Sequence, residues 1–130
     1  MKINRLDHLV LTVASVEKAI EFYTTVLGMA EVTFGEGRKA LAFGSSKINL
    51  HEAGREFDPK ARRPTPGSAD ICLIVDDSIT AVVAALTAAG VRIEEGPVER
   101  TGATGPILSV YLRDPDHNLI ELSNYLSWAN

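Results

Sequence analysis

The chain contains an internal repeat with an offset of 62 residues, and this repeat constrains the fold more than any other feature. The segment His8–Val13 (HLVLTV) aligns with Asp70–Val75 (DICLIV), and the alignment runs without a gap to Gly28 in the first copy and Gly90 in the second. Self-similarity at a fixed offset indicates a duplicated structural unit. Two unrelated strand–helix units would also look alike, but the absence of gaps and the shared glycine favour a duplication.

The first copy predicts a strand, a helix and three more strands. Alternate residues in Arg5–Val13 are apolar, which is typical of a strand with one buried face. Ser15 is a candidate helix N-cap, apolar residues then recur at helical spacing, and Gly28 stands where a helix-terminating glycine is expected. Turns separate the following strands, which we expect at Glu31–Phe34, Arg38–Phe43 and Lys47–Glu52.

Residues 53–69 differ in composition from both copies. They contain three prolines, two glycines and three arginines, which suits an exposed connector. The alternative is that these arginines close over a ligand.

The second copy follows the same plan after this connector. Asp77 or Ser78 takes the N-cap position of its helix. A polar loop is predicted at Gly96–Pro106, and the strands are expected at Asp70–Val75, Val91–Glu95, Leu108–Arg113 and Asn118–Asn124.

The period-2 pattern also predicts which polar residues lie on the sheet faces away from the helices. These residues are His8, Asn49, His51, Asp70 and Glu121. If the two copies curve toward one another, the five side chains converge in a cleft. Imidazole and carboxylate groups are the usual ligands of a catalytic divalent ion, and two imidazoles with one carboxylate form a sufficient set.

Composition limits the classes of function. The length of 130 residues suits one domain, and a net charge of −4 argues against a nucleic-acid-binding surface, which is usually basic. No apolar run approaches the ~18 residues that a membrane-spanning helix needs, and no signal sequence is recognisable. The single cysteine, Cys72, cannot form an internal disulfide, so we expect a cytoplasmic protein.

Four segments carry a resemblance to a known family: Leu6–His8, Ala19–Tyr23, Leu27–Met29 and Asp114–Glu121. Over nearly its whole length the chain resembles the vicinal oxygen chelate superfamily, which includes glyoxalase I, extradiol dioxygenases, fosfomycin-resistance enzymes and bleomycin-resistance proteins. Further stretches are similar to small glyoxalase-domain and virulence-associated members: Arg38–Leu41, Asn49–Glu52, Pro66–Ser68 and Glu94–Pro97.

The resemblance implies an α+β fold. Two tandem βαβββ modules are expected to form an open, barrel-like mixed sheet with the helices outside and a central cleft. We expect a single domain, with module one at about residues 4–52, the connector at 53–69 and module two at about 70–125.

The resemblance also implies site residues. His8 matches the ligand that the family places on its first strand, and Glu121 matches the ligand on the last strand. Asp70 stands where glyoxalase I and the dioxygenases have histidine, and Asn49 stands where glyoxalase I has glutamate. The expected metal site contains His8, His51 and Glu121, with Asp70 as a fourth ligand or as an acceptor behind the ligands.

Each of these assignments has a simpler alternative. His8 could be a hydrogen-bonded core histidine, His51 an exposed strand-end residue, Glu121 a solvent-facing residue and Asp70 a strand-start acid. Cys72 is expected to act as a small buried apolar residue rather than a nucleophile, because no partner that would lower its pKa is visible.

These observations favour a metal-dependent enzyme that acts on a small substrate with adjacent oxygens, either as a lyase or isomerase or, with iron, as a dioxygenase. The ion would be Zn, Ni, Fe or Mn, and Glu121 or a metal-bound water would move the proton. The alternative is a metal-free binding protein of the bleomycin-resistance type. A homodimer is expected, with a small molecule as the binding partner and no nucleic acid or membrane partner.

Overall fold

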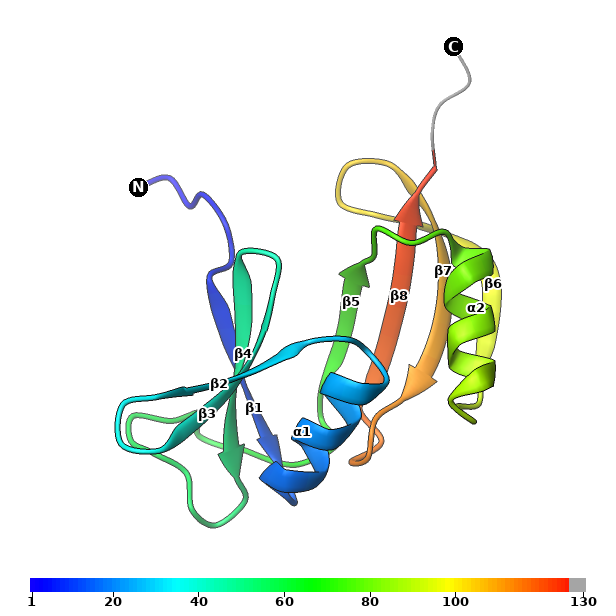
Figure 1. Cartoon of the computed structure of the whole chain (residues 1–130). Helices are drawn as coiled ribbons and strands as arrows, with labels where there is room; N and C mark the ends of the chain where they lie inside the picture. Colours follow the sequence, from blue (N-terminus) through cyan, green and yellow to red (C-terminus); the bar gives the residue numbers. More distant parts are fainter. Residues whose placement is uncertain (127–130) are drawn as a thin grey trace. The chain divides into compact units, whose positions relative to one another are not determined.

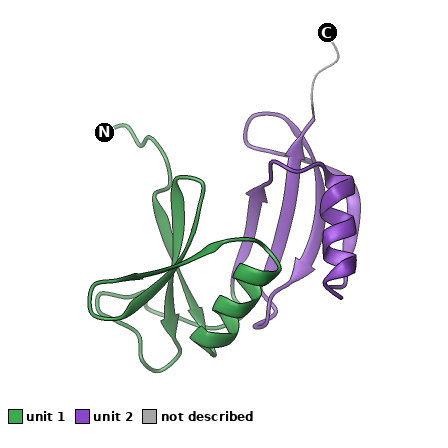
Figure 2. Cartoon of the chain, in the orientation of Figure 1, with its two compact units in different colours: residues 1–68 green, residues 69–130 purple. Residues whose placement is uncertain are grey.

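The computed structural model describes residues 1–126, which fold as two compact units (Figures 1 and 2). Met1–Ser68 form the first unit, here called module one, and module two begins at Ala69. Each module contains one helix and one four-stranded mixed sheet, in the order strand, helix, strand, strand, strand. The predicted duplication of a βαβββ unit is therefore confirmed.

Module one places its first strand beside its last. The sheet order is β1-β4-β3-β2, with β1 parallel to β4 and the other neighbours antiparallel. Its elements are β1 (His8–Val13), α1 (Val16–Thr25), β2 (Ala30–Phe34), β3 (Arg38–Phe43) and β4 (Ser46–Glu52).

Module two repeats this topology, with sheet order β5-β8-β7-β6 and β5 parallel to β8. The register is repeated as well, because Val10 pairs with Asn49 in module one and Cys72 pairs with Glu121 in module two. The elements are β5 (Asp70–Ile74), α2 (Ile79–Ala88), β6 (Glu95–Thr101), β7 (Pro106–Arg113) and β8 (Leu119–Tyr125).

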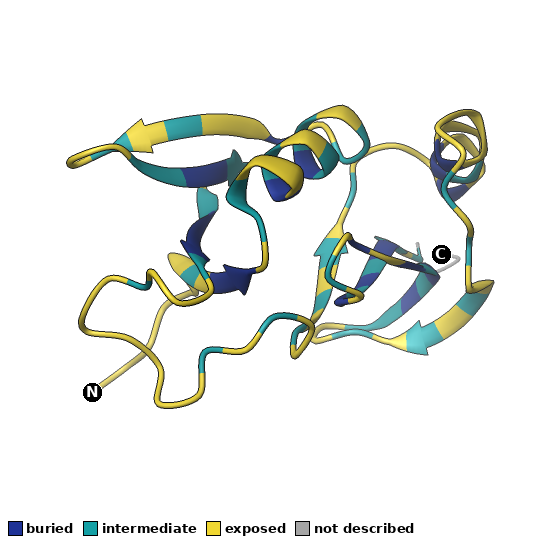
Figure 3. Ribbon diagram, turned by 90° about the horizontal axis from the view of Figure 1, so that it is seen from below, coloured by how far each residue is buried: buried dark blue, intermediate teal, exposed yellow. Residues whose placement is uncertain are grey.

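Each module has its own core between the helix and one face of the sheet. Buried positions, dark blue in Figure 3, lie on one side of each helix and along the two central strands. The helices begin as predicted, because the side chains of Ser15 and Ser78 accept hydrogen bonds from the backbone N–H groups of Lys18 and Ala81. The apolar core residues include Leu11, Val13, Tyr23, Ile48 and Leu50 in module one, and Val82, Leu86, Val110, Leu112 and Ile120 in module two.

One part of the predicted secondary structure is wrong. Residues 91–94 are not a strand, and the expected polar loop at Gly96–Pro106 instead contains most of β6. Gly96 and Pro97 suggest a loop, but β6 is an edge strand with a register shift between Glu95 and Val98. Such a bulge accommodates a proline that lacks an N–H group and a glycine with a φ of +103°.

Neither helix in residues 1–126 has the length and apolar character that crossing a membrane requires.

Candidate functional site

The sheet face of module one that lies opposite the helix side carries three of the predicted residues. His51 pairs with Thr12, Asn49 with Val10 and Lys47 with His8 across the parallel β1–β4 ladder. Paired residues point to the same side of a sheet, and apolar residues such as Leu11 and Leu50 point to the other side. The face therefore alternates as the sequence predicts, with His8, Asn49 and His51 on one side.

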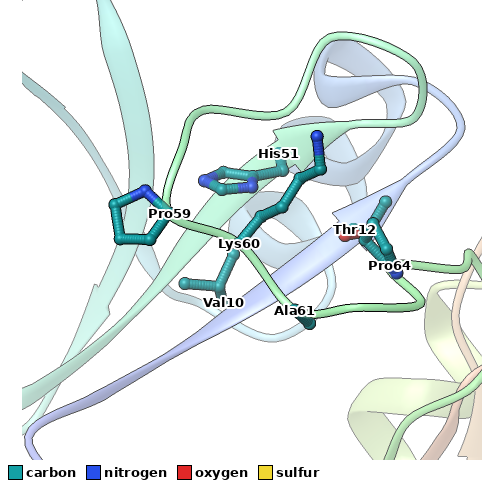
Figure 4. Close-up of a pocket in the computed structure, with 7 residues that line it drawn as sticks. All are labelled: Val10, Thr12, His51, Pro59, Lys60, Ala61 and Pro64. Atoms are coloured by element: carbon teal, nitrogen blue, oxygen red, sulfur yellow. The ribbon is translucent and has the colours of Figure 1, made fainter.

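A cavity of about 390 Å³ lies over this face, and we call it the His51 cavity (Figure 4). The connector covers it from one side, and the sheet supplies the other side. It is lined by Val10, Thr12, His51, Pro59, Lys60, Ala61 and Pro64. The predicted connector thus forms part of a concave site through its proline and lysine residues, whereas its arginines are not among the lining residues.

His51 is held in place by its neighbours and is only 3% exposed. Its Nε2 atom lies 3.5 Å from Nη2 of Arg38, which can only donate, so the ring proton belongs on Nδ1. The guanidinium of Arg38 lies over the ring of Phe57 at 4.4 Å, and the His51 ring meets the Phe57 ring edge-on at 5.5 Å. Burial lowers the pKa of His51, and the positive charge of Arg38 lowers it further, so the imidazole is neutral near pH 7.

Asn49 lies on the same face as the His51 cavity, beside Val10. The residue is 7% exposed, and its Oδ1 atom is buried without a hydrogen-bond partner. A buried carbonyl oxygen without a donor is unusual and energetically unfavourable. This polar face therefore retains an acceptor that module one does not satisfy.

His8 is exposed at the start of β1 and does not belong to the core of module one. Its Nδ1 atom donates to Oδ2 of Asp7 at 2.8 Å, and this hydrogen bond lowers the pKa of Asp7. With the proton on Nδ1, the lone pair of Nε2 is available to a metal ion, and a carboxylate behind a ligating imidazole is a common arrangement. Sequence reasoning did not identify Asp7 as this partner.

The register separates His8 from His51. His8 pairs with Lys47 and His51 with Thr12, so four residues, or about 13 Å of strand, lie between the two imidazoles. Ligand nitrogens of one ion lie within about 4 Å of each other, because each metal–nitrogen bond is about 2 Å long. The structure does not bring these two residues together, and His51 belongs to the cavity described above.

Glu121 occupies the matching polar face of module two, on β8. Its Oε2 atom accepts a hydrogen bond from Oγ of Ser109 at 2.6 Å, and Oγ of Ser123 lies 2.7 Å from Oγ of Ser109. Ser109 and Ser123 are both fully buried. The buried serine pair therefore fixes the orientation of the Glu121 carboxylate.

A second cavity, of about 420 Å³, contains Glu121, and we call it the Glu121 cavity. Tyr111 lies across from Glu121 in the β7–β8 register, and its hydroxyl accepts from Nε of Arg100 at 3.2 Å. Burial raises the pKa of Tyr111, and the Glu121 carboxylate raises it further. The other lining residues are Cys72, Ile74, Thr101, Gly102, Ala103, Ile107 and Tyr125.

Asp70 and Cys72 share this face from β5. Asp70 is exposed and pairs with Leu119, so it is a diagonal neighbour of Glu121. Cys72 is exposed, and its Sγ atom lies 3.4 Å from Oγ of Ser123. Desolvation raises the pKa of the Cys72 thiol, and the negative charges of Glu121 and Asp70 raise it further. This environment disfavours a nucleophilic thiolate, although the residue is not buried as expected.

The polar face of each module carries donor atoms of the kinds that divalent ions bind. His8 offers one imidazole nitrogen, and Asp70 and Glu121 offer carboxylate oxygens on a shared face. Within residues 1–126, no three His, Cys, Asp or Glu side chains form a preassembled metal-binding group. Module one supplies imidazoles and module two supplies carboxylates.

The charges are divided between the modules in a similar way. Residues 1–68 carry ten Lys and Arg residues against eight Asp and Glu residues, whereas residues 69–130 carry three against nine. The acidic module favours cations, and the basic module favours anions.

Sequence reasoning missed Ser109 and Tyr111 as functional residues. Both lie in the predicted strand Leu108–Arg113, and period-2 alternation places them on one face of it. That signal could have identified them, but their contact with Glu121 follows only from the β7–β8 register.

Known proteins resemble this chain throughout its length. Virulence protein STM3117 of Salmonella typhimurium is 60% identical over 97% of this chain and 88% of its own length. The crystal structure of that protein matches with a TM-score of 0.96, covering 97% of this chain and 100% of that chain. The glyoxalase domain-containing protein RDO1 of Mycosarcoma maydis is 58% identical over 96% of this chain and 70% of its own length.

A more distant relative, the metallothiol transferase FosB of Shouchella clausii, is 27% identical over 92% of this chain and 80% of its own length. Residues 5–122 match the family model described as the Glyoxalase/Bleomycin resistance protein/Dioxygenase superfamily. Because this match spans most of the chain and two relatives are more than half identical, the chain belongs to the glyoxalase/bleomycin resistance protein/dioxygenase superfamily.

Proposed function

We propose that this protein is a metal-dependent enzyme that acts on a small substrate with two adjacent oxygen atoms. The reaction would be a lyase or isomerase reaction or, with iron, a dioxygenation. The observation that carries the proposal is the carboxylate of Glu121, which a buried serine pair orients beside a cavity in the acidic module. A carboxylate fixed in this way suits a metal ligand or a catalytic base.

The proposed ligands are His8, Asp70 and Glu121, and the ion would be Zn, Ni, Fe or Mn. When bound, such an ion supplies Lewis acidity toward the oxygens of the substrate. His8 contributes Nε2, because Asp7 holds the proton on Nδ1. The similarity to a relative named as a metallothiol transferase supports a role for a metal.

Three residues of module two have proposed roles in proton transfer and orientation. Glu121 would accept a proton from the substrate through the oxygen that Ser109 does not hold. Tyr111 stays protonated near neutral pH because its pKa is raised, so its phenol can donate a hydrogen bond beside Glu121. Arg100, which donates to the Tyr111 oxygen, fixes the ring within the cavity.

Metal analysis of protein purified without an affinity metal tests this proposal. We expect about one divalent ion per chain in the wild type, and loss of that ion in His8→Ala. His117→Asn is the matched control, since His117 is an exposed turn residue with a φ of 66° that asparagine tolerates. Wild-type protein without an ion, together with an unchanged ion affinity in His8→Ala, would contradict the proposal.

A metal-free small-molecule-binding or resistance protein is the second candidate. It is favoured by the His51 cavity, which is formed within module one without Glu121 or Asp70. A ligand that raises the melting temperature equally with and without a chelator would support this candidate.

We also propose that the protein acts in the cytoplasm as a homodimer. Support comes from Cys72, which has no partner for an internal disulfide, and from the edge strands that end both sheets. Size-exclusion chromatography with light scattering measures the mass directly, and a monomeric mass across the micromolar range would exclude the dimer.

A further inference from the structure

We propose that the His51 cavity binds the carboxylate group of a small organic acid. This cavity lies within module one, and its lining includes none of the residues His8, Asp70 and Glu121. The inference rests on the second candidate function, the metal-free binding protein, for which it names the ligand class, and it does not depend on a bound metal ion.

Three positive side chains lie on or beside this face, and two acidic residues of the connector, Glu56 and Asp58, lie near His51 and Lys60. Lys60 lines the cavity, Arg38 contacts the cavity residue His51, and the amine of Lys47 lies 3.8 Å from the centre of the Phe34 ring. Among the salt bridges formed within residues 1–126, none involves Arg38 or Lys47. The positive charge of Arg38 and Lys47, which these salt bridges do not neutralise, favours an anionic ligand in the neighbouring cavity.

The salt bridge that Lys60 forms competes only weakly with a ligand. Its amine lies 3.5 Å from Oδ1 of Asp58, whose side chain is 84% exposed. Exposed ion pairs of this kind contribute little, so the lysine can exchange its partner for a ligand at small cost. The cavity lining then offers one full positive charge, because His51 is neutral near pH 7. A single charge suits a carboxylate better than a doubly charged phosphate.

The remaining lining is apolar and suits the body of an organic molecule. Val10, Pro59, Ala61 and Pro64 surround the polar groups, and the cavity volume of about 390 Å³ accommodates a molecule the size of a substituted benzene ring. Figure 4 shows Lys60 passing close to His51, with the prolines of the connector on either side. Thr12 adds a hydroxyl that can donate to a carboxylate oxygen.

Phenylacetate and phenylacetamide test the charge requirement, because the two molecules have nearly the same shape and differ in charge. We would titrate each into ¹⁵N-labelled full-length protein that has been treated with a chelator, and follow the backbone amide signals. Phenylacetate is expected to give saturable shifts at Thr12, His51, Lys60 and Ala61 and to bind more tightly than phenylacetamide.

Lys60→Met tests whether the amine of Lys60 supplies the positive charge that binds the carboxylate. We expect it to weaken phenylacetate binding at least about fivefold and to leave phenylacetamide binding unchanged. Lys18→Met is the matched control, because Lys18 is an exposed lysine on α1, away from the cavity. Equal affinity for the two probes, or equal phenylacetate affinity in Lys60→Met and the wild type, would overturn the inference. Because the chelator removes any metal, either result is independent of the proposed enzyme activity.

Discussion

The hydroxyl of Ser109 on β7 lies 2.6 Å from Oε2 of Glu121 on β8, and Ser109 is fully buried. A buried hydroxyl that donates to a half-exposed carboxylate removes rotational freedom from the carboxylate. Glu121 therefore presents its second oxygen in a fixed direction, which is what a metal ligand or a catalytic base requires.

Replacing Ser109 by alanine tests this relationship. We expect Ser109→Ala to weaken divalent-ion binding about tenfold or more, because the carboxylate loses the donor that orients it. The free energy of unfolding should fall by roughly 1–3 kcal/mol, since Ser123 Oγ also loses a buried partner. Ion titration by calorimetry and urea unfolding measure the two effects.

Ser68→Ala is the control for Ser109→Ala, because Ser68 is exposed and its hydroxyl donates to the nearby carbonyl of Thr65. An ion affinity in Ser109→Ala equal to that of the wild type would show that the serine does not position Glu121.

Sequence periodicity predicted which residues share a face, because the side-chain alternation of a strand does not depend on its partners. The 62-residue offset also predicted that Val10 and Cys72 hold equivalent positions, and the structure pairs these two residues with Asn49 and Glu121. Periodicity could not predict distances along a ladder. His8 and His51 were therefore expected in one site, although the β1–β4 register separates them by four residues.

The failure of the sequence to predict β6 has a different cause. Glycine and proline are strong local signals for a loop, and the sequence has no comparable signal for pairing with β7. Tertiary contacts override the local preference here, because β7 supplies hydrogen-bond partners on one side and the bulge accommodates Pro97.

Gly96 shows what this pairing requires. A Cβ atom on residue 96 would clash with the carbonyl oxygen of Ser109 and lie 3.0 Å from Cα of Val110, and φ is +103°. Gly96→Ala should therefore lower the free energy of unfolding by about 3 kcal/mol or more, through backbone strain plus displacement of β7. Urea unfolding followed by circular dichroism measures this loss.

Gly44→Ala separates strain from clash. Gly44 has a φ of +51°, but a Cβ atom there meets nothing within 4 Å, so we expect a loss of only about 1 kcal/mol. Equal losses in the two variants would mean that the close approach to β7 has no energetic consequence.

The lowered pKa of His51 predicts that the free energy of unfolding depends on pH. Burial lowers its pKa in the folded protein below the unfolded value of 6.5. As pH falls below about 6.5 the unfolded chain takes up a proton at His51 that the folded chain resists, so stability decreases. The contribution is fully present above pH 6.5, and it is lost as pH falls from there toward the folded pKa.

The measurement is the free energy of unfolding in urea between pH 7.5 and 5. We expect the loss of stability toward pH 5 to be smaller in His51→Asn than in the wild type, even if the variant is less stable at every pH. His117→Asn should retain the wild-type slope, because His117 is an exposed turn residue. Identical slopes in the wild type and His51→Asn would show that the imidazole titrates equally in the folded and unfolded states.

Cys72 gives a prediction of chemical reactivity. The residue is exposed, yet desolvation and the carboxylates of Glu121 and Asp70 raise the pKa of its thiol. Since the thiolate is the reactive form, iodoacetamide at pH 8 should alkylate the native protein more slowly than the urea-unfolded chain. Glu121→Gln removes one of the negative charges that disfavour the thiolate, so alkylation of the folded variant should be faster than that of the folded wild type. A native wild-type rate at or above the unfolded rate would mean that the Glu121 cavity activates the cysteine, and Cys72 would then have to be reconsidered as a nucleophile.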